Sequence, residues 1–156
     1  MRKKETIEQV TERLGFTTDY IEPYTVVENY IFDIQGLSPT KKLFLLLVRK
    51  YVGSSRRTIQ YGYARIMKDL GIASRNTVSK CIKFFEWLEI LEKYNSVNPS
   101  GEYGTNTYCL NITKIEEVVE HFKINKYKWK DVEKYFELQY KISNDFASTE
   151  PCKYLK

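Results

Sequence analysis

Hydrophobic residues recur at helical spacing along much of the chain. Ile7, Val10 and Leu14 fit a short amphipathic helix over residues 4–14, which Gly15 ends. Ser38-Pro39 supplies an N-cap and a first-turn proline for a second helix that ends near Val52-Gly53. The apolar sequence from Leu43 to Val48 is unbroken, so this helix is predicted to be covered on most sides and to form the centre of the core.

A helix, a glycine and a second helix follow in close succession. The apolar face of Tyr63 to Leu70 predicts a helix, and Gly71 is placed to act as its C-cap residue. Ser74 can cap the next helix, whose buried stripe is Val78, Cys81, Ile82, Phe85 and Leu88. This helix-turn-helix pattern is typical of DNA-binding proteins.

Two strands are predicted after the helix-turn-helix, over Leu91–Asn95 and Thr107–Ile112. The second alternates Tyr108, Leu110 and Ile112 toward the core, and Asn98-Pro99-Ser100-Gly101 has the chemistry of a type I turn. The pair therefore predicts a hairpin of the size of a wing. An earlier stretch, residues 20–33, mixes aromatic and β-branched residues after a proline and predicts a short extended segment and a turn.

Helical patterns return at the C-terminus, over Ile115–Phe122 and Trp129–Phe146, before a tail over residues 148–156 that is expected to be frayed. The second pattern has a stripe of Trp129, Val132, Tyr135, Phe136 and Tyr140. The predicted fold class is α+β, a winged helix-turn-helix with additional N- and C-terminal helices. Its expected parts are a helical arm (1–19), a DNA-binding domain (20–113) and a helical extension (114–156).

The predicted recognition helix carries polar residues opposite its buried stripe. They are Asn76, Ser79, Lys80 and Lys83, with Ser74, Arg75 and Thr77 in or before the first turn. Such side chains contact base edges and phosphates, and a helix fits the major groove of duplex DNA. Arg75 would then read guanine and Asn76 adenine. The alternative is that this stripe is simply a solvated helix face.

Charges near this helix limit the expected contact. Glu86 and Glu89 make its far half acidic, and Trp87 falls near the polar stripe, where we expect the C-terminal region to cover it. The wing loop, residues 96–106, contains no Arg or Lys, whereas minor-groove insertion usually relies on them. Phosphate contacts are expected from Lys93, Arg56, Arg57 and Lys68, although each is also compatible with ordinary surface charge.

The formal charge of +5 favours an anionic partner. Residues 123–134 interleave lysines with Tyr127 and Trp129, a pattern that would suit a nucleic acid strand or a solvated linker whose aromatic residues pack inward.

Catalytic, metal and membrane signals are lacking in the sequence. The three cysteines, Cys81, Cys109 and Cys152, are far apart, His121 is the only histidine, and no phosphate-loop or dinucleotide motif occurs. No apolar run reaches the ~18–20 residues that span a bilayer, and the basic start is followed by Glu5 rather than by an apolar signal core. We expect a cytoplasmic, non-enzymatic protein without cofactor or metal.

A family resemblance runs over residues 24–112. Its motifs are Tyr24-Thr25-Val26-Val27-Glu28-Asn29-Tyr30, Leu37 to Phe44, Lys68-Asp69-Leu70-Gly71-Ile72 and Ser74-Arg75-Asn76-Thr77-Val78. They resemble the N-terminal winged helix domain of replication initiator, replisome-organiser and primosomal proteins from Gram-positive bacteria, their plasmids and phages. The resemblance implies DNA contacts at Arg75, Asn76, Thr77, Ser79 and Lys80.

The sequence thus predicts a duplex DNA-binding protein acting in replication initiation or control of a plasmid, phage or similar element. A winged helix transcription regulator is the alternative, and a protein-interaction module is an alternative of another class. Replication proteins are candidate partners. A homodimer through the Trp129–Phe146 helix is a further hypothesis, against the alternative that its stripe folds back over Trp87 and the core helix.

Overall fold

The computed structural model describes residues 28, 31, 34–51, 58–60, 62–94 and 107–156. In chain order they form α3 (Pro39–Tyr51), β1 (Thr58–Gln60), α4 (Tyr63–Leu70), α5 (Arg75–Trp87), β2 (Leu91–Tyr94), β3 (Thr107–Leu110), α6 (Ile112–Ile124), α7 (Trp129–Ile142), α8 (Phe146–Thr149) and the 3-10 helix η2 (Lys153–Leu155). The α+β class is confirmed. The predicted arm, most of the segment 20–33 and the turn at 98–101 lie outside the described residues.

Helix α3 begins at the predicted proline, where the Lys42 N–H donates to the Ser38 carbonyl at 3.0 Å. Phe44, Leu45 and Val48 are each 1% exposed and face the core, while Leu43 is 52% exposed. The apolar run is therefore buried only in part: Leu43 is exposed and Leu46 and Leu47 are half-buried, because a helix in the outer layer turns one side to solvent.

Helices α4 and α5 and the glycine turn between them lie at the predicted positions. Gly71 ends α4 with a φ of 67°, a left-handed conformation that glycine adopts without strain, and its N–H donates to the Lys68 carbonyl at 3.3 Å. Three residues later the Ser74 hydroxyl oxygen accepts from the Thr77 N–H at 3.4 Å and caps α5. These two caps fix where α4 ends and α5 begins.

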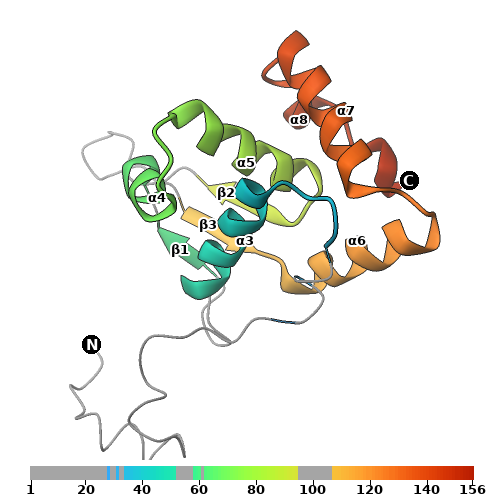
Figure 1. Cartoon of the computed structure of the whole chain (residues 1–156), viewed down its shortest axis with the longest axis horizontal. Coiled ribbons are helices and arrows are strands. Elements are labelled where there is room, and N and C mark those ends of the chain that lie inside the picture. The colour runs from blue at the N-terminus through green and yellow to red at the C-terminus, as the bar shows by residue number, and fades with distance from the viewer. Residues whose placement is uncertain (1–27, 29–30, 32–33, 52–57, 61, 95–106) are drawn as a thin grey trace, which may run out of the picture.

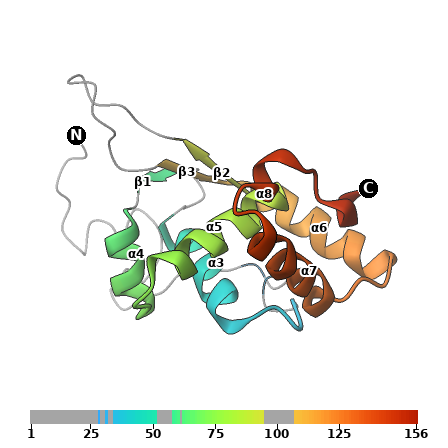
Figure 2. The same cartoon turned by 90° about the horizontal axis from the view of Figure 1, so that it is seen from above.

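A small antiparallel sheet has the strand order β1-β3-β2, and α3, α4 and α5 lie on one of its faces (Figure 2). Leu91 pairs with Leu110 and Tyr94 with Thr107, so β2 and β3 are the predicted strands. Strand β1 was not predicted. Ile112, expected to end β3, instead begins α6, because the Asn111 side chain accepts from the Lys114 N–H at 3.0 Å and caps that helix.

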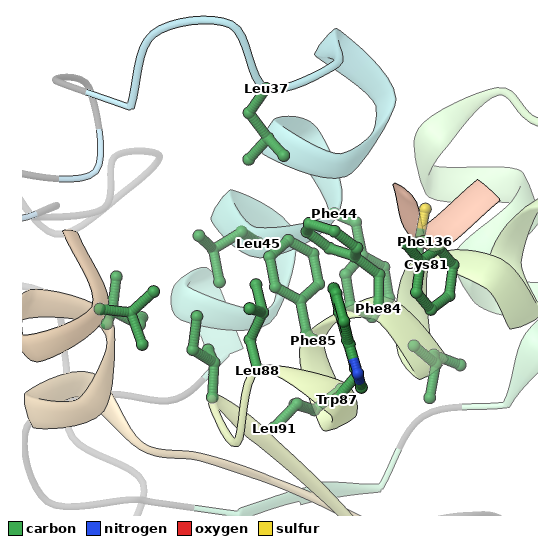
Figure 3. Packing of buried hydrophobic residues seen from close by; sticks show 14 of the residues in the cluster. Leu37, Phe44, Leu45, Cys81, Phe84, Phe85, Trp87, Leu88, Leu91 and Phe136 are labelled. Atoms are coloured by element: carbon green, nitrogen blue, oxygen red, sulfur yellow. The ribbon is translucent and has the colours of Figure 1, made fainter. Parts of the chain in front are cut away.

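The core is one continuous cluster of aromatic and aliphatic side chains from α3, α5, the sheet and the C-terminal helices. Phe44 of α3 stacks on Phe85 of α5 with ring centroids 5.8 Å apart. Figure 3 shows Phe136 of α7 among the rings of α5, and its centroid lies 5.3 Å from that of Phe84. Helix α7 therefore packs on the same core as α5.

The C-terminal segment differs from its prediction in two ways. The predicted Trp129–Phe146 helix ends at Ile142, and α8 begins separately at Phe146. The tail expected to be frayed is packed: Cys152 is 3% exposed, and the Tyr154 ring contacts Trp87 with centroids 6.5 Å apart. The expectation of a loose tail was wrong because its apolar residues complete an aromatic cluster.

Helices α6, α7 and α8 gather on the side of the molecule opposite to α4 (Figure 1). None of the helices in the described part of the chain has the length and apolar character needed to cross a membrane.

Candidate nucleic-acid interface

The N-terminal end of α5 is open to solvent. Ser74, Arg75 and Asn76 are all exposed there, beside the turn that follows α4. The backbone N–H groups of a helix N-terminus and the guanidinium of Arg75 both favour an anion. The Arg75 guanidinium carbon lies 5.4 Å from the ring centroid of Tyr63, so the first residue of α4 helps to hold the arginine.

The rest of the predicted contact stripe is in contact with the C-terminal helices. The Tyr140 hydroxyl of α7 donates to Asn76 Oδ1 at 3.1 Å. Lys80 Nζ donates to Glu137 Oε2 at 3.2 Å, and Lys83 Nζ donates to the Asn144 carbonyl at 3.1 Å. The stripe is therefore not a freely solvated helix face.

The ring of Tyr140 lies between the two lysines. Both ammonium nitrogens are 5.3 Å from its ring centroid, in the range of a cation–π contact. Tyr140 itself is only 5% exposed. One α7 residue thus contacts all three of Asn76, Lys80 and Lys83.

Two glutamates of α7 bind the beginning of α3. Glu133 accepts from the Ser38 backbone N–H at 2.9 Å and from Lys41 Nζ at 2.8 Å. Lys41 also reaches Glu137 at 3.3 Å, so Glu137 joins a lysine of α3 to one of α5. Burial raises the pKa of Glu137, but the charges and hydrogen bonds of Lys41 and Lys80 outweigh it, and the net shift of its pKa is downward.

The apolar stripe of α7 is buried within the chain. Trp129, Val132 and Phe136 are 6%, 0% and 0% exposed, and Phe146 of α8 is 4% exposed. At about 1.5–3 kcal/mol for each large apolar side chain, these four contribute on the order of 10 kcal/mol. This gross contribution from apolar burial makes α7 and α8 part of the core of the chain.

This packing removes the main argument for a homodimer through α7. Trp87 is 3% exposed and lies against Tyr135, Phe136, Phe146 and Tyr154. The expectation that the C-terminal region covers Trp87 is confirmed. The stripe is therefore used inside one chain, as the alternative to the dimer had it.

The far end of α5 is acidic. Glu86, Glu89 and Glu92 line one open pocket of about 410 Å³ together with Lys93. Burial raises the pKa of Glu86, and the nearby Lys93 and Lys83 lower it only in part. Because Lys93 lies among three carboxylates, this end of the helix attracts phosphate less than the first turn does.

The other residues predicted to contact DNA differ in their exposure. Thr77 and Ser79 are half-buried on α5, and Lys68 is exposed in the last turn of α4, close in sequence to the α5 cap. Arg56, Arg57 and the wing loop at 96–106 lie outside the described residues. Lys68, Ser74, Arg75 and Asn76 are thus exposed residues at the end of α4 and the beginning of α5.

The aromatic residues of the 123–134 stretch pack inward, as the linker interpretation had it. Trp129 lies against Phe122 with centroids 4.7 Å apart, and Tyr127 contacts Phe122 at 6.0 Å. Lys123, Lys128 and Lys130 line the open pocket of about 680 Å³ above them.

The cysteines and the histidine do not form a nucleophilic site in the part of the chain that the structure describes. Burial raises the pKa of both Cys81 and Cys152 to about 11, so each remains a thiol at neutral pH. His121 Nε2 lies 2.8 Å from the Tyr154 carbonyl oxygen, which gives the imidazole a packing role.

Comparison of the chain with protein-family models, curated proteins and solved structures finds no match.

Sequence reasoning missed Tyr140, Glu133, Glu137 and Lys41 as neighbours of the interface. The periodicity identified Tyr140 as part of a buried stripe, but it gave no sign of the group that its hydroxyl would meet. The paired spacing of Glu133 and Glu137 on one face of α7 was the available signal, since two carboxylates on a packed face need cationic partners.

Proposed function

We propose that this chain is a winged helix protein that binds duplex DNA with α5 as its recognition helix. The order α3, β1, α4, α5, β2, β3 and the sheet order β1-β3-β2 support this proposal, since they agree with a winged helix. The glycine turn between α4 and α5 supports it further, as does the formal charge of +5.

The observation that carries the proposal is the exposed, cationic first turn of α5 beside an acidic far end. An α-helix with its side chains is about 10–12 Å wide, and the major groove is about 12 Å wide. Because α7 and α8 flank one long side of α5, the helix has no room to lie lengthwise in the groove. It enters by its N-terminal end, where Arg75 and Asn76 reach base edges.

Phosphate contacts around this end position the protein without specifying sequence. Lys68 on α4 is one such contact, and Arg56 and Arg57 are others. Lys80 and Lys83 contribute positive potential rather than direct contacts, because their ammonium groups already have partners in α7 and the segment after it.

The process served is replication initiation or control of a plasmid, phage or similar element. The resemblance of residues 24–112 to initiator and primosomal domains supports this proposal, and transcription regulation is the alternative. A genomic DNA pull-down separates them: an enriched origin favours replication, and an enriched promoter favours regulation.

Salt dependence of binding to a random duplex tests the proposal. Affinity should fall steeply between about 50 and 200 mM salt, because bound cations leave the phosphates on binding. Arg75→Ala should reduce both the affinity for DNA and the discrimination between DNA sites. Lys123→Ala removes one positive charge at an exposed position of α6 and should leave that discrimination unaltered. A binding constant that is flat over this salt range excludes duplex DNA as the partner.

A second function, a protein-interaction module, is favoured by one surface feature. Leu138 and Ile142 of α7 are 52% and 80% exposed and stand one helical turn apart. Loss of a copurifying protein on Leu138→Asp, with no DNA binding by the parent, would support this function over the first.

A further inference from the structure

We propose that Tyr140 is a positioning residue that fixes the side-chain amide of Asn76 and so determines which base Asn76 prefers. The inference rests on the proposed DNA binding through α5. It concerns one hydrogen bond, from the Tyr140 hydroxyl to Asn76 Oδ1 at 3.1 Å.

Tyr140 is held firmly enough to act as a reference point. Its ring is 5% exposed and stacks on Phe136, with centroids 5.8 Å apart and planes inclined by 28°. The ammonium groups of Lys80 and Lys83 each lie 5.3 Å from the ring centroid. The hydroxyl position is therefore set by the packing of α7 on α5 and not by Asn76.

The side chain of Asn76, unlike that of Tyr140, is not fixed by packing, because Asn76 is exposed and belongs to the first turn of α5. A tyrosine hydroxyl can donate to the oxygen of an amide or accept from its NH₂ group, and here the Tyr140 hydroxyl donates to Asn76 Oδ1. The NH₂ group has no partner among the described residues and remains available.

A fixed amide changes what Asn76 can read in the major groove. Bidentate recognition of adenine uses both amide groups, the NH₂ as donor to N7 and the oxygen as acceptor from the adenine amino group. With Oδ1 held by Tyr140, the NH₂ group is the part of the amide left for a base, and it presents donors. Donors match the O6 and N7 acceptors of guanine. Guanine, and not the adenine expected from the residue type alone, is therefore the preferred base opposite Asn76.

The test is selection of sites from a randomised duplex library with the full chain, followed by binding to duplexes that differ at single positions. Four proteins are compared: the parent, Tyr140→Phe, Asn76→Ala and Tyr135→Phe. Tyr140→Phe keeps the ring and removes only the hydroxyl. Tyr135→Phe makes the same chemical change on the same helix, where the ring stacks on Trp87. The melting temperature of each variant shows that the fold is kept.

The parent should prefer guanine to adenine at one position that Asn76→Ala makes indifferent. In Tyr140→Phe the amide is free to turn, so the preference for guanine over adenine at that position should fall roughly 3- to 10-fold, the factor that one hydrogen bond supplies. Other positions should keep their preferences. Tyr135→Phe should match the parent throughout, and Tyr140→Phe added to Asn76→Ala should change nothing further.

Three results overturn the inference, and they differ in what they leave standing. If Asn76→Ala loses a preference that Tyr140→Phe keeps, DNA binding stands and the positioning role fails. If Tyr140→Phe binds all duplexes more tightly, then α7 blocks the DNA face and does not orient Asn76. If the parent enriches no sequence and binds no duplex, the proposed function fails together with the inference.

Discussion

Truncation of Phe136 to alanine tests whether α7 is part of the core that supports α5. The side chain is 0% exposed, and its ring lies within 5.2–5.8 Å, centroid to centroid, of Phe84, Trp87, Tyr140 and Phe146. Its removal leaves a space among four aromatic rings, and rings of this size relax only partly into a gap.

The expected loss is large against the stability of the chain. A buried Phe→Ala substitution costs about 3–5 kcal/mol, out of about 5–15 kcal/mol for a typical domain. With a urea dependence of about 2 kcal/mol per molar, the unfolding midpoint should fall by roughly 1.5–2.5 M. Leu138→Ala is the matched control, because Leu138 is two residues further along α7 and 52% exposed, and its midpoint should move by about 0.25 M or less.

Urea unfolding is followed by tryptophan fluorescence and by far-ultraviolet circular dichroism. Trp87 and Trp129 both lie in the contact between α7 and its neighbours, whereas circular dichroism reports all helices. If residues 114–156 form one cooperative unit with the rest, the two signals coincide and shift together in Phe136→Ala. Separate transitions, or a shift no larger than that of Leu138→Ala, would refute the reasoning and favour an independent C-terminal unit.

Two further predictions concern the turn and the acidic residue of the interface. Gly71→Ala should destabilise the chain by about 1 kcal/mol, because φ is 67° and no atom crowds the site, and Gly71→Asn should cost less; equal melting temperatures for all three proteins would contradict this origin of the turn. Since the folded-state pKa of Glu137 lies below its ordinary 4.5, its contribution is present above that pH and is lost as the pH falls through the lower folded value. Glu137→Gln should therefore lower the melting temperature near pH 7, and the difference from the parent should shrink as the pH falls below 4.5; a difference independent of pH would show that the charge is not responsible.

Local signals were sufficient to predict the helix-turn-helix. Gly71 and Ser74 each act within three residues of themselves, so their roles as C-cap and N-cap could be inferred without knowledge of the fold. Strand β1 could not be predicted in the same way. It has three residues, too few to show an alternation, and it exists because β3 pairs with it.

The predicted ends of helices and strands were wrong where a residue was compatible with two kinds of structure. Ile112 continues the alternation of Tyr108 and Leu110, which favours a strand, yet Asn111 before it is a good N-cap and the helix prevails. The tail at 148–156 looked loose because it is short and polar. Its packing depends on a place for Tyr154 beside Trp87 and on burial of Cys152, which only the assembled core provides.

The candidate contact residues were placed correctly on α5, but their surroundings were not predicted. Periodicity tells which residues share a helix face and is silent on what faces them. Lys80 and Lys83 read as phosphate ligands because they are cationic and point away from the apolar stripe. The same positions suit a carboxylate and a carbonyl group from a neighbouring element, and Glu137 and Asn144 supply them.

The position of Trp87 indicates whether the polar stripe of α5 contacts an external ligand or another part of the chain. It follows Asn76, Lys80 and Lys83 at the spacing of one helix face, so whatever buries the tryptophan must run along that face. The covering segment here lies 57 and 61 residues further along the chain than the two lysines that it contacts. A large aromatic residue in line with a polar stripe therefore predicts that the stripe is an internal contact over most of its length. Under the proposed function, the part left for DNA is the turn furthest from the tryptophan, which in α5 is the turn of Arg75 and Asn76.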